Sequence, residues 1–156
     1  MALVNQSQRD ASAIFSLGNH AQKAAAALPQ TATQHLFVIT GGRVLVRLLF
    51  GEVTTIIQNS DPAIKVTATP TVGTAVDIAS TVDITSLEVG GLLVVEGDGT
   101  ALVKGNAGCS FFAGGAHEFI APTGYIDLIS GASKTGATKW DLYWLPLDDG
   151  ANVVSA

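Results

Sequence analysis

The pattern of hydrophobic and polar positions is most regular between residues 34 and 58. Two apolar runs rich in β-branched residues, 36–39 and 44–46, flank Gly41 and Gly42. Consecutive glycines between such runs are typical of a tight turn, because glycine adopts positive φ without steric cost. We therefore predict a β-hairpin here, with its second strand continuing past Gly51.

The second of these runs also has two distinct faces. Residues two apart in a strand point to the same side, so the spacing predicts an apolar face opposite a face with two cations. The predicted apolar face holds Val44, Val46, Leu48 and Phe50, and the two cations are Arg43 and Arg47.

The first 30 residues have a different pattern, with many alanines and few β-branched residues. Alanine favours helix, so we predict a short helix over residues 20–28, capped by Asn19 and ended by Pro29. So short a helix is unstable alone. The pattern indicates either a partly helical N-terminal arm, 1–30, that orders by packing on another part of an assembly such as a neighbouring subunit, or a frayed terminus. The rest, 31–156, is predicted to be a β domain with a C-terminal tail from Leu147.

Short strand-like segments separated by glycine and proline turns follow throughout residues 31–146. Residues 63–69 alternate as in a half-buried strand, and apolar runs at 92–95 and 125–129 lie between turns. In the segment 138–145, Trp140, Leu142 and Trp144 share one face. About eight to ten such strands with no helical pattern between them predict an all-β fold: an antiparallel sandwich, a jelly roll or a barrel.

The composition is more typical of a subunit of a larger assembly than of a monomeric soluble domain. Hydrophobic residues make up 47% of the 156 residues and charged residues 13%, about half of the usual share. We therefore expect much of the surface to be buried against other subunits, the alternative being a compact monomer of low charge. The net charge of −5 argues against nucleic acid as a partner.

Candidate chemistry is sparse. The one cysteine, Cys109, excludes an internal disulfide framework, and His20, His35 and His117 lie in three unrelated segments without metal-ligand spacing. The sequence therefore predicts no metal site and no cofactor.

Other catalytic or membrane signals are also weak. Glu52, Glu96 and Glu118 could form a glycosidase pair, but nothing in the sequence pairs them. Apolar runs are of strand length, and no secretory signal or membrane span is predicted. We expect a protein that is not an enzyme.

Four stretches carry a resemblance to a known family. They read TGGRVLVRLLFGEVTT at 40–55, TPTVGTAVDI at 69–78, GYIDLISGASKTGATKWDLYWLPLDDGA at 124–151 and VVSA at 153–156. In these stretches the chain resembles small structural proteins of tailed bacteriophages. The resemblance implies a β-rich virion subunit, a capsid decoration or cement protein, made in the host cytoplasm and located on the capsid surface. It also implies a homotrimer that binds the major capsid protein between capsomers and stabilises the head.

Two other functions compete with this one. A tail or fibre component would use a receptor- or glycan-binding face, with Trp140 and Tyr143 stacking on sugars. A polysaccharide-degrading tail enzyme would need carboxylates in a groove. For the decoration protein, the expected subunit or capsid contacts are Arg9, Phe15, Leu28, Arg43, Arg47, Trp140, Tyr143 and Trp144.

Overall fold

The computed structural model describes residues 17–58, 63–106, 117–131 and 135–156. Within them the fold is built of strands: β1 (Asn19–Ala27), β2 (Thr33–Thr40), β3 (Val44–Thr55), β4 (Ala63–Pro70), β5 (Val76–Asp83), β6 (Leu92–Val95), β7 (Val103–Gly105), β8 (Phe119–Ala121), β9 (Gly124–Ser130), β10 (Ala137–Pro146) and β11 (Asn152–Ser155).

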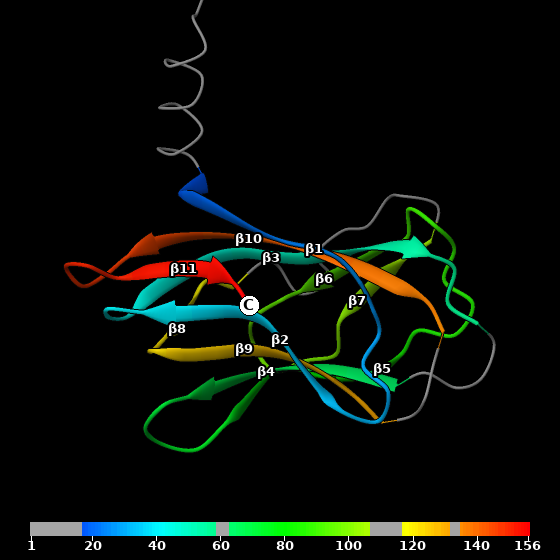
Figure 1. Ribbon diagram of the computed structural model, residues 1–156, viewed down its shortest axis with the longest axis horizontal. Coiled ribbons are helices and arrows are strands. Elements are labelled where there is room, and N and C mark those ends of the chain that lie inside the picture. Colours follow the sequence, from blue (N-terminus) through cyan, green and yellow to red (C-terminus); the bar gives the residue numbers. More distant parts are fainter. Residues whose placement is uncertain (1–16, 59–62, 107–116, 132–134) are drawn as a thin grey trace, which may run out of the picture.

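The strands form two antiparallel sheets that lie face to face (Figure 1). Sheet A has the order β1-β10-β3-β6-β7. The short strand β8 pairs with residues 44–46 of β3, and β6 pairs with residues 49–52 of the same strand. Sheet B has the order β11-β2-β9-β4-β5. The predicted all-β antiparallel fold is confirmed as a two-sheet, sandwich-like arrangement, and the sheets do not close into a barrel.

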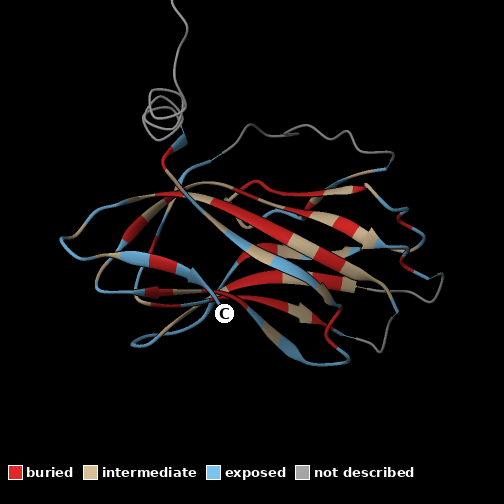
Figure 2. Ribbon diagram, turned by 45° about the horizontal axis from the view of Figure 1, so that its top comes forward, coloured by how far each residue is buried: buried red, intermediate tan, exposed pale blue. Residues whose placement is uncertain are grey.

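The core lies between the sheets, and buried positions alternate with less buried ones along the strands (Figure 2). The predicted face of β10 is confirmed, since Trp140, Leu142 and Trp144 are all buried. Trp140 lies flat against Gly51 of β3, where an added Cβ would come within 2.8 Å of the indole ring. The glycine within this strand therefore makes room for the largest side chain of the core.

The predicted helix over residues 20–28 is wrong. Asn19–Ala27 is strand β1, which pairs antiparallel with β10 from Asn19↔Trp144 to Ala27↔Ala137. Helix propensity is a weak preference that pairing with a long neighbouring strand overrides. Residues 19–27 thus belong to the β domain rather than to an arm, and residues 1–16 lie outside the described part of the chain.

The predicted hairpin around Gly41 and Gly42 is also wrong, although both of its strands exist. β2 lies in sheet B between β11 and β9, whereas β3 lies in sheet A. The two glycines carry the chain from one sheet to the other. Gly41 has a φ of 75°, and an added Cβ would lie 2.0 Å from the carbonyl oxygen of Gly150. Glycine is needed here because the loop before β11 packs against it.

Two further predictions, the apolar face of β3 and the C-terminal tail, are corrected by the structure. The pairing of β3 with β10 shifts register between Leu48 and Val46, so the buried positions switch from Val44 and Val46 to Leu49 and Val53. Leu48 and Phe50 therefore do not share the buried face that alternation predicted, because a β-bulge adds a residue and reverses the faces. The predicted C-terminal tail contains β11, which pairs with β2.

Candidate interaction surfaces

The residues predicted to contact partners fall into three groups. Leu28, Trp140 and Trp144 are buried in the core of the single chain, so the fold does not support a direct role for them in partner contacts. Arg43, Arg47 and Tyr143 lie at least partly on the surface. Arg9 and Phe15 lie outside the described residues, and their contacts stay predictions.

Arg43 joins the two loops at the crossover between the sheets. Its Nε and Nη2 donate to the two carboxylate oxygens of Asp148 at 2.9 and 2.7 Å, and its backbone N–H donates to the same carboxylate at 2.7 Å. These hydrogen bonds hold the pKa of Asp148 well below its ordinary range and raise the pKa of Arg43. The pair thus fixes the loop before β3 to the loop before β11.

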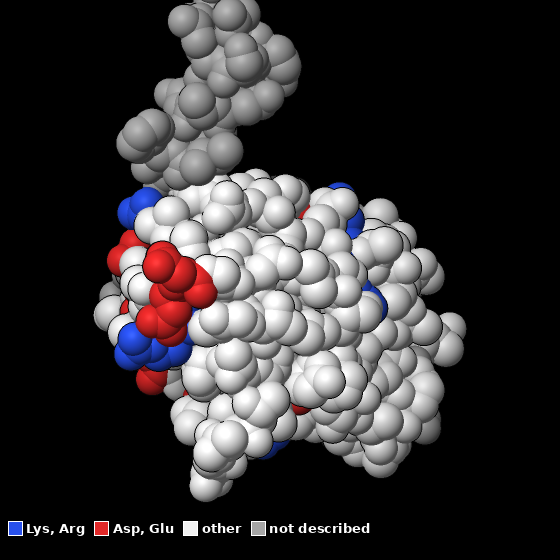
Figure 3. All heavy atoms as spheres, turned by 60° about the vertical axis from the view of Figure 1, so that its left-hand side comes forward, with Lys and Arg blue, Asp and Glu red and all other residues white. Residues whose placement is uncertain are grey.

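The other described cations are also bound within the chain. Arg47 donates to Glu118 at 2.7 Å, Lys65 to Asp77 at 3.0 Å and Lys139 to Glu52 at 2.8 Å. Lys23 and Lys104 donate to the backbone carbonyls of Ala156 and Asp83. Each lysine and arginine among the described residues therefore has an acceptor in its own chain. Figure 3 shows one face on which charged atoms gather in a cluster while most of the surface is neutral.

The outer faces of the two sheets carry matching histidine clusters. On sheet A, His20 Nε2 lies 2.7 Å from Asp141 Oδ1, and the imidazole stacks on Tyr143 with ring centres 4.7 Å apart. Gln22 donates to the same oxygen at 2.8 Å. Since Asp141 and Tyr143 are two residues apart on β10, they share the face opposite the buried tryptophans.

Sheet B repeats this arrangement with residues from other strands. His35 Nδ1 lies 2.6 Å from Asp127 Oδ1, and the imidazole stacks on Tyr125 at 4.1 Å. Thr69 donates to Asp127 Oδ2 at 2.6 Å, so both oxygens of this buried carboxylate are occupied. Each cluster holds one histidine and one carboxylate. Within the described ranges no group of three or more His, Cys, Asp or Glu side chains could hold a metal ion.

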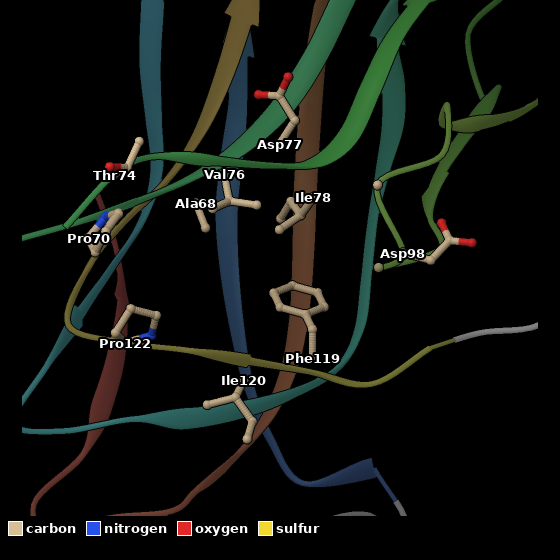
Figure 4. A pocket seen from close by; sticks show the side chains of 12 residues that line it. Ala68, Pro70, Thr74, Val76, Asp77, Ile78, Asp98, Phe119, Ile120 and Pro122 are labelled. Carbon is tan, nitrogen blue, oxygen red and sulfur yellow. The ribbon is translucent and has the colours of Figure 1, made fainter.

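A groove opens along one side of the sandwich, between sheet B and the short strand β8 of sheet A. We call it the edge groove. It has a volume of about 430 Å³ and is lined by the ends of β4 and β5, the loop 97–99 and residues 119, 120 and 122. Figure 4 shows Ala68, Val76 and Ile78 on one side and the ring of Phe119 facing them from the other.

The two ends of the edge groove differ. At one end Pro70 and Pro122 lie opposite each other (Figure 4). At the other end the loop 97–99 is attached to β5, because the Gly99 N–H donates to the Ile78 carbonyl and the Ser80 N–H to the Thr100 carbonyl. Asp98 stands at this end, and a hydrogen bond from the Thr100 hydroxyl lowers its pKa.

Neither the histidine clusters nor the edge groove has a local sequence signal. His20 and Asp141 are 121 residues apart, and the groove brings together three strands and the loop 97–99 from separate parts of the chain. A tyrosine and an aspartate stand two residues apart on both β9 and β10, but without the sheet order nothing in the sequence indicates which histidine they meet.

Comparisons with known proteins identify no relative. No family model, no curated protein and no solved structure is significantly similar to this chain. In the described residues, no helix has both the length and the apolar character needed to cross a membrane.

Proposed function

We propose that this protein is a bacteriophage virion subunit that acts through its surfaces rather than through a reactive centre. Its role is that of a decoration protein, which binds the major capsid protein between capsomers and stabilises the head. The proposal joins the resemblance of four stretches of the chain to the way its surface is built. It includes self-association, with a homotrimer as the expected state.

The pairing of every described cation within its own chain is the observation that carries the proposal. A surface that binds nucleic acid needs lysine and arginine side chains available for phosphates. Here the six described cations are held by acceptors of the same molecule. What is left for a partner is a surface of polar and apolar groups on which acidic side chains outnumber basic ones.

Large apolar side chains also stand on the surface. Isolated cases are normal on soluble proteins. Here they recur on strands and loops of both sheets, and together they fit a protein that contacts neighbours over several faces. The exposed set comprises Leu17, Ile56, Val72, Val76, Val89, Ile120, Tyr125, Leu147 and Val154.

The alternative, a tail or fibre component with a glycan-binding face, loses Trp140, one of the two aromatic residues expected to stack on sugars. Trp140 and Trp144 are buried in the core, so sugars cannot stack on them in this fold. Tyr143 remains half-buried on the outer face, with His20 stacked on it. A glycan face would have to rest on this cluster and on its counterpart at Tyr125.

The number of copies in a virion separates the two functions. Purified particles that contain the protein would be separated by gel electrophoresis, and its band compared with that of the major capsid protein. A decoration protein should appear in a fixed, near-stoichiometric ratio to the capsid protein, and antibody labelling should cover the head. A handful of copies, or labelling confined to the tail, would refute the proposal.

A further inference from the structure

The edge groove lies between strand edges that the described structure leaves available. β5 pairs with β4 on one side, and the loop 97–100 covers its other edge at Ile78 and Ser80. Val76 lies beyond this cover and is 60% exposed, and it stands with Ala68 and Ile78 on the side of the groove across from Phe119 (Figure 4). Extended segments add to such edges through backbone hydrogen bonds, while side-chain pockets provide specificity.

We propose that the edge groove receives the N-terminal segment, residues 1–16, of a second copy of the chain, with Phe15 as the apolar anchor. This inference deepens the proposed function, because it names the contact through which copies of the subunit associate.

The sequence of the segment suits an apolar groove. In an extended conformation, Ala11, Ala13 and Phe15 point to the same side, which places one large aromatic residue after two small ones. The groove offers a phenylalanine ring, two prolines and aliphatic side chains. An aromatic side chain buried among such groups is the kind of residue that anchors an interface.

The position at which the described chain begins shows why a second copy is required. Asn19 pairs with Trp144, Trp144 with Val46, and Val46 with Phe119, so Asn19 and Phe119 lie in one row across sheet A. Three strand spacings separate them, which is about 14 Å.

Four residues connect Phe15 to Asn19, and they span at most about 14 Å when fully extended. A path of that length to Phe119 would have to run straight through β10 and β3. The path around them is longer than this backbone span, so we infer that Phe15 enters the groove of another copy rather than that of its own chain. It can enter the groove of a neighbouring copy when the β5–β8 side of that copy lies beside β1 of the first chain.

Such a contact joins two different surfaces, the start of β1 on one copy and the β5–β8 side on the next. Head-to-tail contacts of this kind close into rings when the rotation between copies allows it. A cyclic trimer, the state expected from the resemblance, is one such ring.

Cross-linking between two differently marked full-length chains tests the proposal. In a Cys109→Ser background, a chain with Ser16→Cys, which leaves the Phe15 anchor in place, would be mixed with a chain with Val76→Cys and treated with a short bis-maleimide. The matched control partner carries Val89→Cys, since Val89 is 62% exposed and does not line the groove. Circular dichroism and thermal unfolding would first confirm that each variant is folded.

We expect at least about tenfold more mixed dimer with the Val76→Cys partner than with the Val89→Cys partner, because the docked segment raises the local concentration of the two thiols. Equal yields with the two partners would overturn the proposal. So would a link formed within one chain by a protein that carries both Ser16→Cys and Val76→Cys.

A second variant pair tests the same contact without cross-linking. Val76→Glu places a charge in the groove and should shift the full-length protein from oligomer to monomer in analytical ultracentrifugation, whereas Val89→Glu should not. If Val76→Glu leaves the oligomer intact, the groove is not the docking site. These outcomes use purified protein alone, so they are separate from the virion copy number that tests the proposed function.

Discussion

The two long sides of the sandwich are built differently. On one side, edge strand β1 of sheet A lies against β11 and β2 of sheet B, and Lys23 donates a hydrogen bond to the Ala156 carbonyl. On the other side, β5 of sheet B and β8 of sheet A stand apart and leave the edge groove between them. We refer to these as the closed side and the open side.

The residues explain the difference. β1 contains five alanines, and small side chains let the edges of two sheets approach each other. On the open side β8 has three residues and ends before Pro122, which has no backbone N–H to continue a ladder. The edge of this sandwich therefore closes where the strand is long and has small side chains. It stays available for a partner where the strand is short and is followed by proline.

Trp144→Ala on the closed side should have the largest effect. Trp144 is buried and pairs with Asn19 at the start of β1, so its truncation should cost about 3–5 kcal/mol of unfolding free energy. Phe119→Ala on the open side removes a half-buried ring and should cost about half as much. Urea denaturation of the two variants measures both values. Equal losses would show that the groove is as well packed as the closed side.

The sequence predicted where the strands lie better than it predicted which strands pair with each other. Alternation located β4 and β10 and identified the buried face that includes Trp140, and an apolar run between turns located β9. Alternation is local, and it cannot tell a hairpin from a crossover between sheets. The glycines at 41 and 42 therefore had the right residues for a turn, but their actual role depends on Gly150, more than 100 positions later.

The candidate surfaces were harder to predict for the same reason. Arg43 and Arg47 were recognised as outward cations, but their partners Asp148 and Glu118 come from distant segments. The alanines of β1 predicted a helix because their local preference is helical. They form a strand only because they pair with β10. Pairing partners, which decide where a groove opens, are not encoded in local patterns.

Gly18→Ala should have the next largest effect, because it disturbs the entry to the closed side. Gly18 has a φ of 91°, and an added Cβ would lie 2.3 Å from the Trp144 carbonyl oxygen. Gly90→Ala is the control, since its φ of 86° is similar but no atom lies within 4 Å of the added Cβ. We expect a cost of about 1 kcal/mol for Gly90→Ala and at least about 2 kcal/mol for Gly18→Ala. Thermal or urea unfolding measures the difference, and equal costs would mean that β1 can shift away without loss.

The two core tryptophans allow a smaller comparison. Trp140 Nε1 donates to the Thr138 hydroxyl at 3.1 Å, whereas Trp144 Nε1 is buried with no hydrogen-bond partner among the described residues. Replacing either residue with phenylalanine removes a similar volume. Trp140→Phe should therefore be less stable than Trp144→Phe by about 1 kcal/mol, the value of one buried hydrogen bond. A larger loss for Trp144→Phe would indicate that its indole N–H has a partner in the intact assembly.

The smallest expected effect concerns stability at low pH. It compares one carboxylate on the closed side with one carboxylate on the open side. Asp148 is held by Arg43 at the loop that leads into β11 on the closed side, and Asp98 stands at the rim of the groove. The folded protein lowers the pKa of both, so each favours the folded state above the unfolded pKa of about 3.9, and this contribution is lost as the pH falls. Asp148→Asn should therefore flatten the fall in stability between about pH 5 and pH 2 more than Asp98→Asn does, because the Arg43 hydrogen bonds lower the pKa of Asp148 further. Urea midpoints measured across that range check the order, and a steeper curve for Asp148→Asn than for the unmodified chain would contradict it.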